Sequence, residues 1–226
     1  MNFRSAAEIV YPHIVALCSV PKPYFDVPKE NPEFMAGTGM LLGTSNYILT
    51  AKHVVPPPNW KMLVGINPPE KVPEMTWTNF EVSAQFPQHD LAIIRAPELN
   101  VSFLERIRRL KFSYDIPGYG VPLGSFGYPQ PIIEIDSTIR RFGVGMVLKF
   151  KSFYVAAIHR DPDTSYIALD SFAYGGHSGG PVFDFEGKIL ALIVRRELDT
   201  FGKIQISYSQ ASLLKNIQKE LQTFLK

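Results

Sequence analysis

Cysteine is almost missing from this sequence, because Cys18 is the only one among 226 residues. A lone cysteine excludes a disulfide within the chain, and it excludes zinc or iron–sulfur centres built on clustered cysteines. The fold must therefore be stabilised by core packing, and we expect no metal and no cofactor. A chain without disulfides is typical of a reducing compartment, so we expect a cytoplasmic protein.

Long apolar runs are missing as well. A membrane-spanning helix needs roughly 18 consecutive apolar residues, and no segment approaches that length. Near the N-terminus, Pro12 and His13 interrupt the apolar stretch that a signal peptide would require. We therefore expect neither a membrane partner nor a secretory signal.

Neither sign of charge dominates. The 23 Lys and Arg residues face 21 Asp and Glu residues, a formal net charge of +2, which argues against a nucleic-acid partner. We interpret the basic cluster at residues 104–110 as a solvated face rather than a binding site. With 46% hydrophobic residues, the chain is apolar enough to fold as one unit over residues 1–226.

Proline and glycine, in contrast, are spread along the whole chain. These 19 prolines and 16 glycines separate short apolar runs rich in Val, Ile, Phe and Tyr, which predicts many short strands and an all-β fold. Strand signals are fewest at residues 97–120, so we expect an N-terminal half at 10–100 and a C-terminal half at 118–208. Only the tail has apolar residues at three- and four-residue steps. It predicts a helix over residues 209–225, docked on the second half.

Ser178 lies in a glycine-rich loop, GGHSGGP at residues 175–181, between two predicted strands. Glycines such as Gly176 can adopt backbone angles that point successive N–H groups into one concavity, where an oxyanion could bind. Alone, such a pattern is more often an ordinary turn than a catalytic loop.

His53 and Asp90 supply two further candidates. His53 ends an apolar predicted strand, and Asp90 opens the buried run DLAII. A carboxylate at the entrance to a buried strand needs a partner, because an unpaired buried charge is costly. An imidazole N–H would be such a partner, and the pair would leave the ring able to accept a proton from Ser178.

Together these segments resemble the chymotrypsin/trypsin-like serine peptidase family, in particular its bacterial HtrA-like branch. The order His53, Asp90, Ser178 matches the family, and the resemblance extends from about residue 36 to residue 208. Five segments carry it: GTGMLL (37–42), TAKH (50–53), DLAI (90–93), VPLGS (121–125) and GHSGGP (176–181).

The resemblance implies two six-stranded antiparallel β-barrels, the first within residues 10–100 and the second within 118–208, followed by a C-terminal α-helix. It implies that His53 is the general base, that Asp90 orients it and that Ser178 forms the acyl-enzyme. The backbone N–H groups of Gly176 and Ser178 would form the oxyanion hole. The substrate would be a protein or peptide.

The sequence departs from the family at two places. His177 stands where many members have an aspartate that pairs with a newly cleaved N-terminus, so activation by such cleavage is not expected. We interpret His177 as a loop residue contributing mainly backbone, rather than as a metal ligand or second base. After Ser209 the remaining tail is too short for the PDZ domain that HtrA proteins append.

The resemblance places the primary substrate pocket around Phe172, Val194, Arg195 and Arg196. No acidic residue occupies the position of Phe172, which argues against preference for Lys or Arg at the cleavage site. We expect an apolar residue there, although Arg195 and Arg196 leave acidic residues open. His159, in the preceding predicted strand, is interpreted as an ordinary strand residue.

Two other functions compete with an active endopeptidase. One is a pseudoprotease-like binding module, which the presence of His53, Asp90 and Ser178 argues against. The other is a protease that stays latent until a regulatory protein partner assembles its site.

Overall fold

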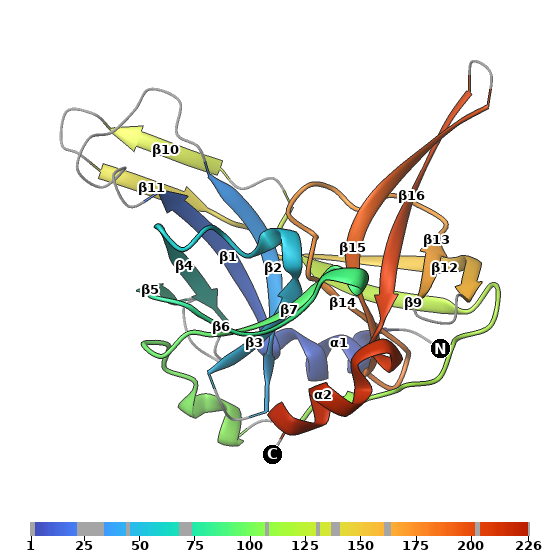
Figure 1. The fold of residues 1–226 in the computed structure, drawn as a ribbon, viewed down its shortest axis with the longest axis horizontal. Helices are drawn as coiled ribbons and strands as arrows, with labels where there is room; N and C mark the ends of the chain where they lie inside the picture. The colour runs from blue at the N-terminus through green and yellow to red at the C-terminus, as the bar shows by residue number, and fades with distance from the viewer. Residues whose placement is uncertain are drawn as a thin grey trace.

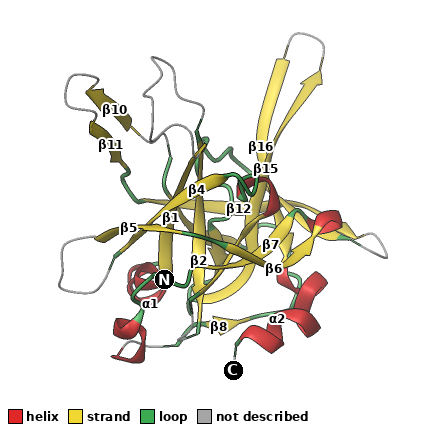
Figure 2. Cartoon of the chain, turned by 60° about the vertical axis from the view of Figure 1, so that its left-hand side comes forward, coloured by secondary structure: helices red, strands yellow, loops and turns green. Residues whose placement is uncertain are grey.

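The computed structural model describes residues 3–21, 34–43, 46–67, 74–106, 109–129, 132–136, 141–160, 164–201 and 204–225. Two antiparallel β-sheets dominate this part of the chain (Figure 1). Figure 2 shows the same arrangement after rotation, with helices α1 (Arg4–Val10) and α2 (Gln218–Phe224) along the lower side of the view. The predicted all-β class is therefore confirmed.

The first sheet contains seven strands in the order β5-β4-β1-β2-β3-β7-β6. Its central strands are almost entirely buried, which explains their continuous apolar runs such as IVALC and LAII. The strands are β1 (Ile14–Pro21), β2 (Met35–Leu42), β3 (Tyr47–Ala51), β4 (Trp60–Ile66), β5 (Glu74–Thr78), β6 (Glu81–Phe86) and β7 (Leu91–Arg95).

The second sheet is ordered β14-β9-β12-β13-β16-β15-β8. An additional pairing between β14 and β15 closes six of these strands into an antiparallel barrel, and β8 joins β15 in parallel outside it. The strands are β8 (Lys111–Phe112), β9 (Pro122–Gly127), β12 (Lys149–Arg160), β13 (Ser165–Leu169), β14 (Pro181–Phe183), β15 (Lys188–Phe201) and β16 (Ile204–Leu213).

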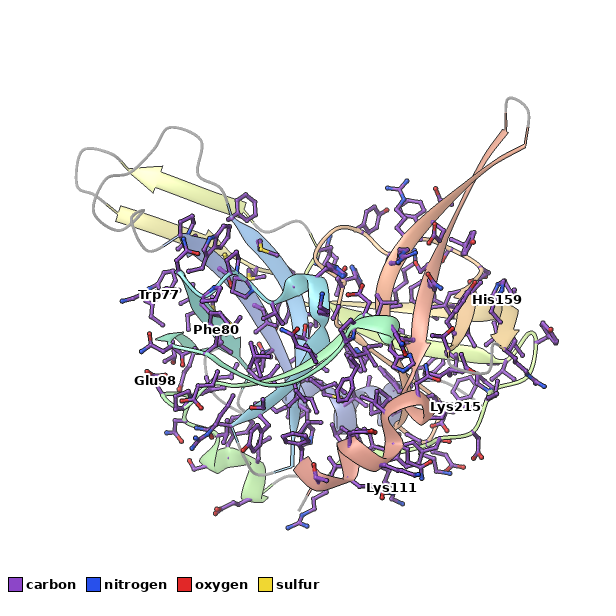
Figure 3. All side chains as sticks on the ribbon, in the orientation of Figure 1. Trp77, Phe80, Glu98, Lys111, His159 and Lys215 are labelled. Carbon is purple, nitrogen blue, oxygen red and sulfur yellow. The ribbon has the colours of Figure 1, made fainter. Side chains whose placement is uncertain are left out.

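The two sheets differ in closure. Within the described residues, no pairing joins β5 to β6 at the ends of the first sheet, which has seven strands where six were expected. A separate hairpin, β10 (Ile132–Asp136) with β11 (Arg141–Gly145), projects from the body of the molecule, as does the outer part of the β15–β16 hairpin (Figure 1). Figure 3 labels Trp77 of β5 on the first sheet and His159 of β12 on the second.

Each terminal helical segment has an aromatic contact with the half of the chain that is farther from it in sequence. Helix α1 (Arg4–Val10) follows Phe3, whose ring stacks 4.2 Å from Phe185 in the β14–β15 turn. Helix α2 (Gln218–Phe224) places Phe224 edge-on against Tyr47 of β3, with ring centroids 5.1 Å apart. The tail, expected to dock on the second half, contacts both halves: Asn216 exchanges hydrogen bonds with Ser165 of the second half, and Phe224 packs on the first sheet.

The tail also remains a strand longer than predicted. Residues 209–213 continue β16, where Ser209 pairs with Leu169 and Arg196, and a 3-10 turn over Leu214–Ile217 precedes α2. The apolar residues Ala211 and Leu213 fit the inward face of a strand as well as a helical stripe, so periodicity misplaced the boundary. In the described part of the chain, no helix is long and apolar enough to cross a membrane.

Candidate active site

His53 lies in a short 3-10 helix, Lys52–Val54, at the end of β3. The strand before it is buried, whereas 47% of the His53 side chain is exposed. The ring is therefore fixed to the first sheet yet accessible to a substrate. The neighbouring residue Lys52 lines a cavity of about 410 Å³ together with Val55, Pro56, Pro58, Phe80, Val82 and Gln85; the His53 side chain is not part of this lining.

Asp90 holds His53 through both carboxylate oxygens. Its Oδ2 lies 2.7 Å from His53 Nδ1, and its Oδ1 accepts the His53 backbone N–H at 3.1 Å. Since an ionised carboxylate can only accept hydrogen bonds, Nδ1 must carry the proton and Nε2 is left as a free acceptor. That tautomer is the one that general-base chemistry requires.

Asp90 reaches this position through an unusual backbone conformation. It is the one described non-glycine residue with a positive φ, at 51°, and its backbone carbonyl accepts the N–H of Lys52 at 2.9 Å. Aspartate tolerates the left-handed region better than most residues, because its short polar side chain can hydrogen-bond locally. The short helix Pro87–His89 and this single residue turn the chain into β7.

Ser178 lies in the loop between β13 and β14, which two left-handed glycines shape. Gly176 has φ +97° and Gly179 has φ +85°. A Cβ atom on Gly176 would lie 2.2 Å from the Tyr128 carbonyl oxygen, and one on Gly179 would lie 2.0 Å from that of Thr38. Only glycine fits either position, which accounts for the glycine-rich sequence.

Only some of the backbone N–H groups of this loop donate hydrogen bonds within the described residues. Gly179 N–H donates to Ile193 at 2.7 Å and Gly180 N–H to His177 at 2.8 Å. Within the described residues, the N–H groups of Gly176 and Ser178 donate to no acceptor. Both residues are partly exposed, so these N–H groups are open to solvent; they are the two donors that the family resemblance assigns to an oxyanion hole.

Thr38 of β2 joins the loop to the first sheet. Its backbone N–H donates to the Ser178 carbonyl at 2.8 Å, and its hydroxyl donates to the Gly176 carbonyl at 2.7 Å. The same hydroxyl accepts the Tyr128 N–H at 3.0 Å, and Thr50 donates to the Thr38 carbonyl at 2.7 Å. Thr38 is fully buried, so these bonds fix the loop against β2, the neighbour of the strand that precedes His53.

The structure brings His53 and Asp90 into contact and lays the Ser178 loop against the same sheet. No hydrogen bond joins Ser178 to His53 in the described part of the molecule. Nucleophile–base hydrogen bonds are often long in substrate-free sites and shorten when substrate binds.

His177, expected to contribute mainly backbone, buries its ring. It is 2% exposed, and its ring packs so closely on Gly127 that a Cβ there would lie 2.5 Å from it. Within the described residues, neither ring nitrogen has a hydrogen-bond partner. Burial, reinforced by the positive charges of Lys151 and Lys149, lowers the pKa of His177 to about 4, so the ring is neutral at pH 7.

The predicted pocket residues separate into two groups. Phe172 and Arg196 lie together, with the guanidinium carbon 4.7 Å from the ring centroid. Val194 is buried, and Arg195 pairs with Glu197 at 3.1 Å. Arg195 and Arg196 diverge because side chains alternate along a strand. Val194 and Arg195 instead line a small cavity of about 60 Å³ that also borders Asp90.

Two residues near the loop were missed by sequence reasoning. Thr38 lay inside the GTGMLL segment but received no role, and Lys151 of β12 received none either. The Lys151 ammonium donates to the Phe172 carbonyl and lies 5.7 Å from the Tyr174 ring centroid. Its only signal in the sequence was a lysine between two phenylalanines in a predicted strand region. His159, eight residues along β12, stacks on Tyr166 at 4.2 Å.

Comparison with known proteins identifies the family. Residues 37–192, more than half of the chain, match the trypsin-like peptidase domain family. The chain belongs to this family. No curated protein matches the sequence.

Solved structures share the fold. The active form of the Rv3671c protease from M. tuberculosis superposes with a TM-score of 0.63 at 18% identity, covering 97% of this chain and 83% of that one. The HtrA-type protease AlgW, solved with a tripeptide, has a TM-score of 0.65 at 16% identity and covers 100% of this chain. This chain spans 64% of the AlgW chain. At these identities the likeness defines the fold, and the predicted chymotrypsin-like architecture is confirmed.

Proposed function

We propose that this protein is a serine endopeptidase that cleaves proteins or peptides through an acyl-enzyme on Ser178. The observation that carries the proposal is the contact of 2.7 Å between His53 Nδ1 and Asp90 Oδ2. It leaves Nε2 of a half-exposed ring free to accept a proton, and the loop with the unused N–H donors packs against the same sheet. A purely structural ion pair would not require that exposure.

The chemistry follows from these positions. Ser178 Oγ attacks the substrate carbonyl while His53 Nε2 accepts its proton, and the Asp90 carboxylate stabilises the imidazolium that forms. The N–H groups of Gly176 and Ser178 donate to the oxyanion of the tetrahedral intermediate. His53 then protonates the leaving amine, and the C–N bond breaks. In the second half of the reaction His53 Nε2 takes a proton from water as the water oxygen attacks the acyl carbonyl; His53 returns that proton to Ser178 Oγ as the Oγ–acyl bond breaks and the carboxylic acid leaves.

Proteolysis of a fluorescently labelled casein tests the proposal. Wild-type protein should release labelled peptides, whereas Ser178→Ala and His53→Ala should each lower kcat by about a million-fold, as expected for residues that act as a unit. Lys188→Met serves as a control, because its ammonium pairs with Glu186 on the surface. Equal proteolysis by wild type and Ser178→Ala would contradict the proposal.

The latent protease is the second candidate, favoured by the missing Ser178–His53 hydrogen bond. In that case binding of a partner protein or peptide would bring the Ser178 hydroxyl within reach of His53. Fluorophosphonate labelling of Ser178 distinguishes the two: the active enzyme is labelled alone, and the latent one only after the partner is added.

A further inference from the structure

The side chains of Lys151 and Arg196 both lie close to the ring of Phe172, which is six residues before Ser178 in the sequence. Lys151 Nζ is 5.2 Å from the Phe172 ring centroid, and the Arg196 guanidinium carbon is 4.7 Å from it. They come from different strands, β12 and β15. Phe172 therefore lies between two positive charges at the base of the loop that carries Ser178.

Lys151 is half-buried, with its ammonium among the rings of Phe153, Phe172 and Tyr174. It shares a face of β12 with Phe153, which is fully buried, and its Nζ lies 5.1 Å from the Phe153 ring centroid. Its charge also contributes to the lowered pKa of His177, the neighbour of Ser178 in sequence. The ammonium thus lies beneath the catalytic loop, surrounded by rings and held by the Phe172 carbonyl.

Four arginine or lysine side chains in the described part of the chain form ion pairs: Arg4 with Glu8, Arg95 with Glu81, Lys188 with Glu186 and Arg195 with Glu197. Lys151 and Arg196 are distinguished by lying over the same ring, that of Phe172.

Within the described residues, neither Lys151 nor Arg196 forms an ion pair. Arg196 donates only to the Ser207 hydroxyl, at 3.2 Å. Asp170 acts on Lys151 through its charge, but its carboxylate accepts the Tyr154 N–H at 2.9 Å. Burial lowers the pKa of Lys151, so its positive charge is incompletely compensated.

We propose that Lys151 and Arg196 select an acidic residue, Asp or Glu, on the amino side of the scissile bond. The proposal rests on the proposed function and names its substrate class, replacing the apolar preference expected from the sequence. A carboxylate arriving here gains charge-assisted hydrogen bonds from donors that have no acidic partner. The rings of Phe172 and Tyr174, 5.1 Å apart and nearly perpendicular, offer apolar contact to its methylene groups.

Peptides that differ only at the cleavage-site residue test the preference. With Glu, Gln, Leu and Lys placed there in turn, the wild-type kcat/KM for Glu should exceed that for Gln by about 10- to 100-fold, the effect of a charge-assisted hydrogen bond. The comparison of Glu with Gln isolates charge, because the two side chains have nearly the same shape.

Substitution of Lys151 and Arg196 tests whether these two side chains cause the preference for Glu over Gln. Lys151→Met should bring the Glu-to-Gln ratio close to one, and Lys151→Glu should favour the Lys peptide over the Glu peptide. Because Lys151 is partly buried, Arg196→Gln supplies an exposed second variant, which should lower the same ratio by about tenfold. Lys188→Met also removes one positive charge and should leave the ratio unchanged.

Fluorophosphonate labelling separates this inference from the proposed function. A wild-type protein that labels on Ser178 but cleaves the Leu or Lys peptide best overturns the acidic preference alone. A Glu-to-Gln ratio of kcat/KM that stays unchanged in both Lys151→Met and Arg196→Gln overturns the assignment of the acidic preference to these residues. A protein that neither labels nor cleaves overturns the proposed function, and the inference with it.

Discussion

The half of the candidate site on the first sheet is held by a side-chain carboxylate, whereas the half on the second sheet depends on glycine backbone shape and on the hydrogen bonds of Thr38. Asp90 uses both carboxylate oxygens on His53. The Ser178 loop depends on Gly176 and Gly179, and it encloses the unpartnered ring of His177. The first half should therefore respond to loss of charge and the second to added volume or protonation.

Loss of the Asp90 charge should have the largest effect on activity. Asp90→Asn keeps a side chain that tolerates the left-handed backbone, so the turn should survive. The amide has a single oxygen, so it cannot accept from both Nδ1–H and the backbone N–H of His53; the productive tautomer of His53 is lost and kcat should fall about 10,000-fold. Peptide hydrolysis measures this, with unfolding in urea as the control for stability. A loss below tenfold would contradict an orienting role for Asp90.

Added volume should break the second half. In Gly179→Ala the new Cβ would lie 2.0 Å from the Thr38 carbonyl oxygen, in a backbone conformation that disfavours any side chain. Strain and clash together should lower the free energy of unfolding by about 3 kcal/mol or more. Gly120→Ala is the matched control, because its φ is +68° but nothing lies within 4 Å. Its cost should be only about 1 kcal/mol. Equal losses in the two variants would refute the close contact.

Acid should weaken the second half through His177. Its folded pKa of about 4 lies below the ordinary value of 6.5, so the unfolded chain gains a proton first as the pH falls through this window. The contribution of His177 to the free energy of unfolding is fully present above pH 6.5 and is lost as the pH falls toward 4. At about 1.4 kcal/mol per pKa unit, the loss amounts to up to about 3 kcal/mol.

The matched variant for this prediction is His177→Phe, which keeps a buried ring that cannot titrate. Chemical unfolding at neutral pH and near the folded pKa should show a smaller acid loss in His177→Phe than in wild type. The same acid loss in both proteins would show that His177 does not carry the dependence.

The smallest effect is expected at Thr38, which joins the Ser178 loop to the first sheet. Thr38→Val keeps the shape of the side chain but removes the hydroxyl that bonds to Gly176 and Tyr128. The loss should be about 1 to 3 kcal/mol, because two buried groups lose their partner. Thermal unfolding measures this loss of stability. A change within a few tenths of a kcal/mol would mean that the hydrogen bonds of the Thr38 hydroxyl do not stabilise the fold.

The sequence predicted the elements of the site better than their contacts. The positions of His53 and Asp90 relative to strands were readable, because a polar residue that ends an apolar run marks a strand boundary. Gly176 and Gly179 indicated a backbone conformation that other residues rarely adopt, and the structure shows positive φ angles and no room for a Cβ atom at both positions. The all-β class followed from the spacing of prolines and glycines.

Other features depend on contacts between distant segments. The tail strand was mistaken for helix because residues 209–212 are flanked by β13 and β15, which local periodicity does not reveal. The burial of His177 depends on Gly127 lying 50 residues earlier in the chain. Lys151 gained a role only because β12 brings it beneath Phe172.

The most direct test of the account is the site at which a fluorophosphonate becomes attached. Mass spectrometry of the digested adduct should find the phosphonyl group on Ser178 in wild-type protein and on no residue in Ser178→Ala, with labelling strongly reduced in His53→Ala. Folded wild-type protein that stays unlabelled, with or without added peptide, or that carries the group on another residue, would contradict the assignment of Ser178 as the nucleophile.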